Sequence, residues 1–476
     1  MKHPRASRSG FGFFWRPVFL AAGLGLGGGC TTAPVTPAPL STETAAAKFA
    51  ERSLQDAGLR RFLADNLGRE PGAWDFETLS WVAFYFHPSL DLARAQWATA
   101  RATQQTVTAR PNPTISLVPG YSTNPDVGVS PWFPAINFDF LLQTSGKRAH
   151  QADIARADTE VARLAVVSAA WSVRSELRRA LVDAASAAHR EALLREQVAV
   201  QQKLLALAEQ RLAAGAAAAS EVAVARSVLF KTESAALDAR GQSAAARARA
   251  AAALGLPLAS LDGVELPAPA SLPALAPEAL ATARQQSLQT RADVLAALAH
   301  YNSAQAALEL EAAKQQPDIH LGPGYQWDQG QNKWSLALTF ELPLFHRNEG
   351  PIAEATSRRA EAAAQFTAAQ AQAIAAMDAA TTAQATAAAQ FDHARRQREV
   401  AEKQSALAQA RLAAGETDQT DLQYARLASA DANLALADAE SAAALAAGQL
   451  EDALQVPFPN LAALADPARA KPSRSP

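Results

Sequence analysis

Sulfur-bearing residues are scarce in this sequence of 476 residues, which has one cysteine, Cys30, and two methionines, Met1 and Met377. A single cysteine cannot form an internal disulfide, and two methionines cannot build a relay of thioether ligands for Cu(I) or Ag(I). Aromatic residues are also few, at 7% of a chain that is 49% hydrophobic, because alanine supplies most of the apolar content. This composition predicts long, closely packed helices rather than bulky cores.

A strong excess of charge is missing as well. Lys and Arg number 44 against 46 Asp and Glu, so the net charge is −2, and no basic stripe is available to displace counterions from phosphates. We therefore expect no nucleic-acid partner. The sequence also lacks a glycine-rich phosphate loop, and its eight histidines are scattered. Nothing in it predicts catalytic residues, a cofactor or a metal site, so the chain is not expected to be an enzyme.

The first residues have the pattern of an export signal. Basic residues precede an apolar, glycine-rich stretch that is too short to span a bilayer, so residues 1–29 are predicted to be a signal peptide. Cys30 follows at once and resembles the acylation site of bacterial lipoproteins, with residues 30–45 as a lipid-anchored tether. The alternative is an ordinary signal that is cut nearby and leaves an idle thiol. Residues 459–476 are expected to be a flexible tail.

One long stretch of the chain occurs twice. Residues 402–426 repeat residues 202–226 at a constant offset, and the PGY that ends at Tyr121 recurs at Tyr325. Long similarity at one spacing indicates duplication of a whole structural unit. Two tandem structural repeats are therefore predicted, with a proline-rich connector between them: 46–258, 259–277 and 278–458.

Each repeat contains a hairpin in which the apolar period changes from about 3.6 to 2. In the hairpins, residues 113–143 and 317–343, runs such as Trp334, Leu336 and Leu338 alternate with polar residues on the opposite face. Strands of about ten residues, apolar on one face and with aromatics near their tips, are what a membrane β-barrel requires. The alternative is a hairpin on a soluble core, but no other strands are predicted to cover the apolar face.

The number of predicted strands has a consequence for assembly. Four strands in one chain cannot close a barrel. Open strand edges in lipid would leave backbone groups without hydrogen-bond partners, at a cost of several kcal/mol each. Other chains must therefore close the barrel, and three copies would give twelve strands.

A long alanine-rich helix is predicted after each hairpin, over residues 146–213 and 352–413. At 1.5 Å per residue each would reach roughly 90–100 Å. In the first helix, Leu193, Val200 and Leu207 form one apolar seam, and a second seam lies about 200° away around the axis. Two apolar flanks are typical of a helix in the wall of a tube, because a coiled-coil dimer needs only one.

Each long helix ends at a helical tip, residues 211–220 and 411–420. Gly215 and Gly415 are expected to adopt the left-handed conformation that caps a helix. Ser220 and Thr420 are expected to be the N-caps of the returning helices.

Two helical segments are predicted upstream of the first hairpin. Residues 45–67 are expected to be helical. The aromatic run over residues 74–90 is interpreted as the buried start of the next helix, with a membrane-active segment as the alternative.

Taken together, the twin PGY hairpins, the twin tips with an acid six residues after each glycine, and the two long helix pairs resemble the TolC-type outer-membrane efflux family. The resemblance implies a mainly α fold with membrane β: a trimer whose twelve-stranded β-barrel in the outer membrane continues into a long twelve-helix α-barrel in the periplasm. It implies a passive exit duct of a tripartite efflux system. Metal cations or small toxic compounds would be delivered by an RND-type inner-membrane pump and a periplasmic adaptor.

Two strand-to-helix junctions carry a narrower similarity. FDFLLQTSGKRAHQ around Lys147 and ELPLFHRNEGPIAEA around Arg347 are similar to the outer-membrane components of cobalt, zinc and cadmium efflux systems. The junction residues themselves are interpreted as structural, with cations that cap or snorkel at the boundary. On the polar face of the strands, Asp318, His320 and Glu341 are more typical of a hydrated lining than of a metal site, which needs three or four convergent ligands.

The resemblance also assigns roles at the tips. Asp421 matches a position in the acidic constriction at the closed periplasmic end, and Glu221 is its counterpart in the first repeat. Tyr424 stands where some relatives carry a second aspartate, so the gate is either electrostatic or steric. The alternative for both acids is stabilisation of a helix N-terminus, worth a few tenths to about one kcal/mol. The tip residues expected to dock the adaptor are Arg211, Leu212, Gly215, Arg411, Leu412 and Gly415.

A rival hypothesis comes from a different class of protein. Long helical hairpins also occur in periplasmic coiled-coil lipoproteins that act as adaptors or structural spacers and never span the membrane. Such proteins lack two barrel-like hairpins with aromatic ends, so the channel is preferred.

Overall fold

The computed structural model describes residues 37–68, 72–267 and 277–455 and divides the chain into two units, 1–51 and 52–476. In the first unit, α2 (Thr42–Ala50) begins after Ser41, whose hydroxyl accepts a hydrogen bond from the Thr44 amide at 3.3 Å. Cys30, the predicted signal peptide, residues 30–36 of the tether and the tail over 459–476 lie outside the described residues, and so does much of the predicted connector.

The helix expected over residues 45–67 is instead two helices. α2 ends at Ala50, and α3 spans Ala57–Leu67. The physical reason is Asp56, whose carboxylate accepts a hydrogen bond from the Leu59 amide at 2.8 Å and so starts a new helix. A short acidic side chain favours this capping position over a helix interior.

The aromatic run forms the centre of the main hydrophobic core. It folds as α4 (Phe76–Phe86), followed by α5 (Pro88–Thr108). Trp81, Phe84 and Phe86 are at most 1% exposed and pack in one cluster with residues of α6 and α7. The prediction of a buried helix, rather than a membrane-active segment, is confirmed.

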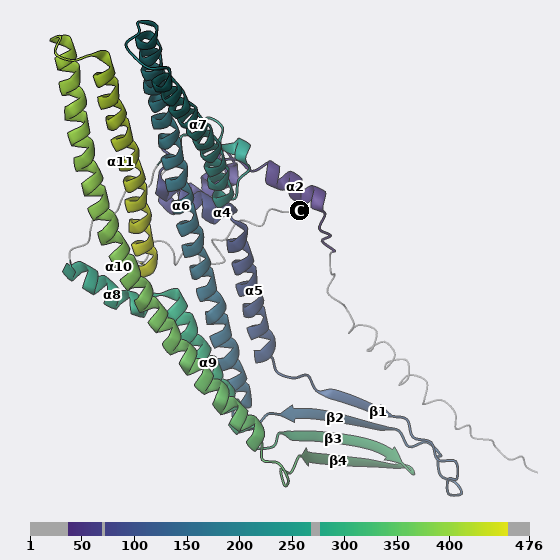
Figure 1. Cartoon of the computed structure of the whole chain (residues 1–476). Helices are drawn as coiled ribbons and strands as arrows, with labels where there is room; N and C mark the ends of the chain where they lie inside the picture. The colour runs from purple at the N-terminus through teal and green to yellow at the C-terminus, as the bar shows by residue number, and fades with distance from the viewer. Residues whose placement is uncertain (1–36, 69–71, 268–276, 456–476) are drawn as a thin grey trace, which may run out of the picture. The chain divides into compact units, whose positions relative to one another are not determined.

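Two helical hairpins dominate the second unit (Figure 1). The first consists of α6 (Lys147–Ala213) and α7 (Ala219–Leu254), and the second of α10 (Glu349–Ala413) and α11 (Gln419–Leu454). The long members have 67 and 65 residues and the returning members 36 each, or about 100 and 54 Å at 1.5 Å per residue. The two long helices begin and end within a few residues of the predicted positions.

The helices pack in a definite order. α7 contacts α6, α6 contacts α11, and α11 contacts α10, so α7 and α10 are the edge helices of this layer. Nearer the sheet, α5, α6, α9 (Ala292–Ala313) and α10 pack in that order. The packing is close because alanines recur every seven residues on the buried side of α10: Ala373, Ala380, Ala387, Ala394 and Ala401.

Two short elements lie at either end of the predicted connector. The 3-10 helix η1 (Leu258–Leu261) follows α7 and packs against it. α8 (Pro277–Thr290), which was not predicted, precedes α9 and contacts α9, α10 and α11.

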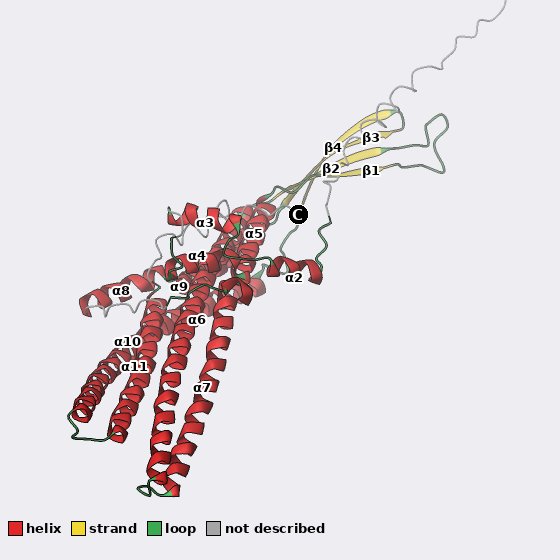
Figure 2. Cartoon of the chain, turned by 90° about the horizontal axis from the view of Figure 1, so that it is seen from above, coloured by secondary structure: helices red, strands yellow, loops and turns green. Residues whose placement is uncertain are grey.

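Four antiparallel strands form one sheet in the order β1 (Thr114–Val118), β2 (Ala135–Leu142), β3 (Ile319–Asp328) and β4 (Gln331–Phe340). Figure 2 shows them side by side, beyond the helices that they join. The two hairpins, far apart in the sequence, meet where β2 pairs with β3, for example Ile136 with Tyr325. β1 and β4 are left as edge strands.

The first hairpin is shorter than the predicted ten residues per strand. β1 has five residues and β2 has eight, with only an isolated bridge between Tyr121 and Trp132 beyond them. Pro119, Pro131 and Pro134 surround this bridge, and proline cannot donate to a strand ladder. Among the described residues, no helix combines the length and the apolar content needed to cross a membrane.

Candidate functional site: the helical tips, the sheet and their supports

Both helical hairpins turn through the same backbone motif. The amide of Gly215 donates to Leu212 O at 2.9 Å, and that of Ala216 donates to Arg211 O at 2.8 Å. The second tip repeats these bonds 200 residues later, at 3.1 and 2.9 Å. Gly215 and Gly415 have φ of +71° and +77°, so the predicted left-handed caps are confirmed, in Schellman geometry.

The returning helices start two residues earlier than predicted. Their N-caps are Ala218 and Asp418, so the prediction of Ser220 and Thr420 as N-caps was wrong. Asp418 accepts a hydrogen bond from the Asp421 amide at 2.9 Å, whereas Ala218 has no side-chain acceptor. The carboxylate of Asp418 is a good N-cap, two residues before the hydroxyl of Thr420, which explains the earlier start in the second repeat.

Glu221 and Asp421 both lie in the first turn of a returning helix and are exposed. Glu221 Oε1 accepts a hydrogen bond from the Ala218 amide at 3.3 Å and so caps its own helix. Asp421 accepts a hydrogen bond from the Thr417 hydroxyl instead. The two acids thus sit at equivalent positions, but only Glu221 is engaged with an N-terminal amide.

The residues that follow Asp421 differ in burial, both from one another and from their counterparts in the first repeat. Tyr424 is 60% exposed, as is its counterpart Val224 at 63%. Gln423 is 1% exposed, and neither its amide nitrogen nor its amide oxygen has a hydrogen-bond partner among the described residues. Its counterpart Ala223 is exposed, because α11 lies between α10 and α6 whereas α7 is an edge helix.

The adaptor-docking residues predicted from the sequence lie together at the two turns. Arg211, Gly215, Arg411 and Gly415 are exposed, Leu212 is at the margin with 37% exposure, and Leu412 is partly buried. One helical turn below, a clasp joins the two helices of each hairpin. Arg226 pairs with Glu209 at 2.8 Å and Arg426 with Gln409 at 3.3 Å.

Polar contacts also join the two hairpins to each other. Gln197 of α6 donates to Asp431 of α11 at 2.7 Å, and Arg190 donates to both oxygens of Asp438 at 2.7 and 2.8 Å. Burial raises the pKa of the Asp431 carboxyl, and the hydrogen bond from Gln197 opposes this shift. These contacts could not be read from the sequence, because no periodicity indicates which polar side chains of two distant helices meet.

A buried ionic cluster holds the far end of α11 to α6. Arg174 and Arg178, 7% and 6% exposed in their side chains, both pair with Glu451, which is 15% exposed. The guanidinium groups also lie over the ring of Phe76, at 4.9 and 4.4 Å from its centroid. Gly448 allows Arg178 to cross α11, since a methyl group there would lie 2.4 Å from Arg178 Cδ.

The two strand-to-helix junctions contact the same segment at the end of α9. Lys147, only 6% exposed, donates to Gln316 O at 2.6 Å and to Asp318 at 2.8 Å. In the other junction, Asn348 has φ of +59° and its side-chain amide donates to Glu311 O at 2.7 Å. The structural interpretation of Lys147 agrees with these contacts.

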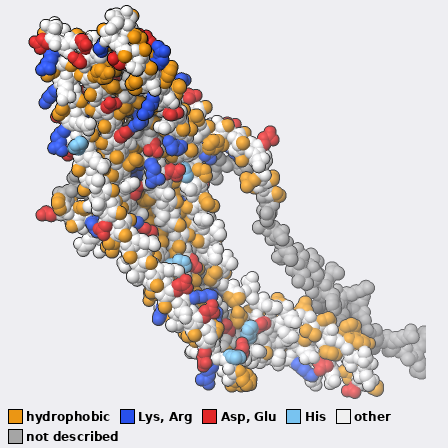
Figure 3. Space-filling model, viewed as in Figure 1, with side chains coloured by type: hydrophobic (Ala, Val, Ile, Leu, Met, Phe, Trp, Pro, Cys, Tyr) orange, Lys and Arg blue, Asp and Glu red, His pale blue; other side chains and the backbone are white. Residues whose placement is uncertain are grey.

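The sheet has large apolar side chains that are exposed to solvent. Every residue of β4 is exposed, including Trp334 at 81% and Leu336 at 69%. In the space-filling view of Figure 3, hydrophobic side chains predominate over the sheet, and charged ones gather where it meets the helices. Among the polar residues, His320 Nδ1 lies 3.1 Å from both carboxylate oxygens of Asp139. No group of three or more metal-ligating side chains occurs in the part of the chain that the structure describes.

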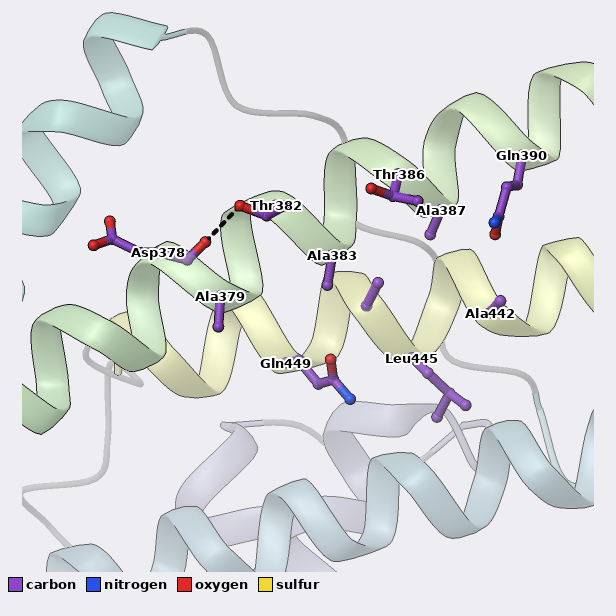
Figure 4. Close-up of a pocket in the computed structure, with 11 residues that line it drawn as sticks. Asp378, Ala379, Thr382, Ala383, Thr386, Ala387, Gln390, Ala442, Leu445 and Gln449 are labelled. Carbon is purple, nitrogen blue, oxygen red and sulfur yellow. Dashed lines mark hydrogen bonds between the residues drawn. The ribbon is translucent and has the colours of Figure 1, made fainter.

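A shallow groove of about 750 Å³ runs between α10 and α11 (Figure 4). Alanine, threonine and glutamine side chains line most of it, and Ala379 and Ala383 of α10 point toward α11. Thr382 is bonded to the carbonyl of Asp378 within its own helix, at 3.0 Å. Few polar groups converge there, so the groove lacks the anchoring groups of a small-molecule site.

Comparison with known proteins identifies the class. The outer membrane efflux protein family matches residues 86–256 and 283–455, which together are most of the chain. The chain therefore belongs to this family of channel proteins and is not an enzyme, and the rival hypothesis of a spacer lipoprotein loses its support. No curated protein sequence matches it significantly.

Several solved structures share the fold at low sequence identity. VceC of Vibrio cholerae, an outer membrane protein, is 22% identical with a TM-score of 0.66, over 80% of this chain and 95% of VceC. The CmeC outer membrane channel of Campylobacter jejuni is 15% identical with a TM-score of 0.66, over 92% and 98% of the two chains. The open state of the MtrE channel of Neisseria gonorrhoeae is 18% identical with a TM-score of 0.61, over 89% and 98%.

Proposed function

We propose that three copies of this chain form a closed channel through the outer membrane, with a helical tunnel in the periplasm. The observation that carries this proposal is that both layers of the chain are open at their edges. Among the described residues, β1 and β4 each pair with one strand, and α7 and α10 each contact one neighbour in the layer α7, α6, α11 and α10. Three chains with four strands would close a twelve-stranded barrel and a twelve-helix tube.

Exposed apolar side chains on the edge helices support the same assembly. On α7, Val224, Phe230 and Leu237 are 61–69% exposed, and on α10, Val400 and Leu407 are 55% and 52% exposed. Large apolar side chains on two opposite edges are typical of surfaces that another chain covers. In the closed tube, α10 of one copy would lie against α7 of the next.

The channel would be the passive exit duct of a tripartite efflux system. A periplasmic adaptor would dock at the six exposed tips, and an RND-type pump in the inner membrane would supply the energy. The resemblance of the two junction segments to cobalt, zinc and cadmium systems favours metal cations as cargo over small toxic compounds. Polar side chains such as His320, Asp139 and Thr339 would line the water-filled barrel.

The tips would also close the tunnel. In a trimer, three copies of Asp421 and three of Glu221 would lie near the axis and attract cations. Because Glu221 already caps its own helix at 3.3 Å, we assign more of the gate to Asp421. Tyr424, 60% exposed one turn further along α11, would narrow the opening sterically.

The test is planar-bilayer conductance of the purified trimer. Asp421→Asn should reduce cation selectivity and block by divalent cations, while the matched variant Glu221→Gln should change them less. Tyr424→Ala should raise conductance without changing selectivity. A monomer in detergent that forms no pores would contradict the channel, whereas pores whose selectivity is equal in parent and Asp421→Asn would contradict only the acidic gate.

Cys30 is proposed to carry a lipid anchor, on the strength of its position directly after the export signal. Metabolic labelling with a radioactive fatty acid should mark the parent and leave Cys30→Ala unlabelled. Label on neither protein would contradict acylation. The trimer itself should persist in the variant, because its contacts lie elsewhere.

A further inference from the structure

The loop that follows β4 is a surface that the channel proposal does not by itself explain. We define the foot as residues 342–347, the sequence LPLFHR. Leu342, Leu344 and Phe345 are 61%, 72% and 93% exposed. His346 and Arg347 follow them and are also exposed. Exposed apolar side chains are thus followed directly by an imidazole and by the cationic guanidinium of Arg347.

Hydrogen bonds hold the backbone at the end of the foot. The Leu344 amide donates to Leu342 O at 2.8 Å, which makes a tight turn within the foot, and the Gln315 side chain donates to Arg347 O at 2.9 Å, which ties the end of the foot to the segment after α9. Asn348, next in the chain, is bonded to Glu311 O at 2.7 Å. With its backbone held in this way, the foot leaves Phe345 93% exposed.

The equivalent junction of the first repeat is built differently. Its cation, Lys147, is buried and its ammonium group is satisfied by Gln316 O and Asp318. Arg347 has no ion pair among the residues that the structure describes, and only its backbone is engaged. The second junction therefore directs both its aromatic ring and its guanidinium outward, although the two junctions meet the same segment of α9.

The foot continues the exposed apolar face of β4. Trp334, Leu336, Leu338 and Phe340 lead along the strand toward it, all between 46% and 81% exposed. At the opposite end of the strand, Lys333 pairs with Asp328 at 2.8 Å, which marks a polar boundary. A strand of ten residues matches the length that crosses a bilayer, so the foot stands at the other boundary.

We propose that the foot binds phospholipid at the periplasmic edge of the outer membrane. Phe345 and Leu344 lie among the glycerol and upper acyl carbons, and the Arg347 guanidinium binds the headgroup phosphate. The chemistry fits because aromatic rings favour this interface, and because a guanidinium binds a phosphate through two parallel hydrogen bonds. This inference rests on the proposed outer-membrane channel and adds a specific lipid contact to it.

The first experiment measures what surrounds position 345. Phe345→Cys in a Cys30→Ala background is labelled with the fluorophore NBD, and the full chain is reconstituted in vesicles of phosphatidylethanolamine and phosphatidylglycerol. The matched control is a label at Arg396→Cys, an exposed position on α10 far from the sheet. We expect blue-shifted emission and quenching by spin-labelled lipid at position 345 only. Water-like emission at 345 in conducting trimers would overturn the inference, and so would cross-linking of this cysteine to a second copy.

The second experiment tests the phosphate contact. Native mass spectrometry measures binding of phosphatidylglycerol to the trimer, for which Arg347→Gln should weaken affinity about fivefold. Arg347→Lys should recover part of the loss, and the control Arg396→Gln should have no effect. Equal affinities for parent and Arg347→Gln, in trimers that still conduct, would overturn this contact and leave the channel intact. Loss of trimers and pores in the parent itself would instead contradict the proposed function.

Discussion

The two helical hairpins have nearly equal lengths and the same turn, yet different forces hold them in place. The far end of α7 is anchored by apolar packing, with Leu254 fully buried among the aromatic residues of α4. The far end of α11 has a smaller apolar cluster around Leu450 and Leu454 and depends in addition on Glu451 and its two arginines. The first hairpin is therefore held in place by apolar packing, whereas the second depends also on buried ion pairs.

The tips repeat this contrast. GAAAASE in the first hairpin offers one carboxylate, which is occupied in capping its helix, and GETDQTD in the second offers several. The clasps differ in the opposite sense, since the charged Glu209 of the first hairpin corresponds to the neutral Gln409 of the second. Duplication therefore preserved the backbone motif, while the side chains of the two copies diverged.

The largest effect is expected at the ionic cluster. Glu451→Gln leaves the buried Arg174 and Arg178 without their shared counterion, which should lower the free energy of unfolding by about 3–5 kcal/mol. Denaturant unfolding of the detergent-solubilised protein measures it. Leu254→Ala is the matched change at the far end of α7. It should lower the free energy of unfolding by about 2–5 kcal/mol, with little dependence on pH. A loss below about 1 kcal/mol for Glu451→Gln would contradict the ionic attachment of α11.

A smaller and equal effect is expected at the two turns. Gly215→Ala and Gly415→Ala each place a Cβ in the left-handed region, at a cost of about 1–2 kcal/mol. Nothing lies within 4 Å of the added Cβ at either position, so backbone strain is the whole cost. Thermal unfolding of both variants should give the same shift. A clear difference between them would show that the side chains of the tips also constrain the turn.

Asp452, next to the ionic cluster, is expected to make the stability of the fold depend on pH. Burial raises the pKa of the Asp452 carboxyl, against the opposing hydrogen bond from Ser175 and the charge of Arg178. The folded state therefore binds this proton more tightly than the unfolded state, whose carboxyl pKa is about 3.9. Stability is lost as pH rises from about 3.9 to the raised value, and the loss persists at neutral pH.

Asp452→Asn removes this penalty. At pH 7 the variant should be at least as stable as the parent, and the difference should vanish as the pH falls below the ordinary carboxyl range. Unfolding curves of parent and variant across acidic pH provide the measurement, with Asp238→Asn on α7 as the exposed control. A variant that is less stable at pH 7 would reverse the sign assigned to this carboxyl.

The smallest effects are expected at the clasps. Arg226→Gln breaks an exposed ion pair and should cost about 0.2–1 kcal/mol, less in high salt. Arg426→Gln breaks a hydrogen bond to a neutral amide, so its cost should be similar in size but independent of salt. Unfolding at low and high sodium chloride separates the two. An equal salt dependence would remove the electrostatic difference between the clasps.

Much of the fold could be predicted because the signals are local. The change of apolar period located the strands, the alanine-rich composition located α6 and α10, and the glycines located both turns. The errors arose where a neighbouring residue had a stronger local effect. Asp56 divided a predicted helix in two, Asp418 took the cap assigned to Thr420, and three prolines shortened the first hairpin.

The sequence by itself determined the repeat, the periods of its helices and strands, and the positions of the tips, because these depend on residues close together in the chain. Only the tertiary structure decided that α11 lies between two helices and α7 at an edge. That arrangement buries Gln423 at 1% exposure and leaves its counterpart Ala223 exposed. It also places Asp431 beside Gln197, and Glu451 beside two arginines. Burial and ion pairing depend on which helices become neighbours, and the periodicity of one helix does not specify its partner.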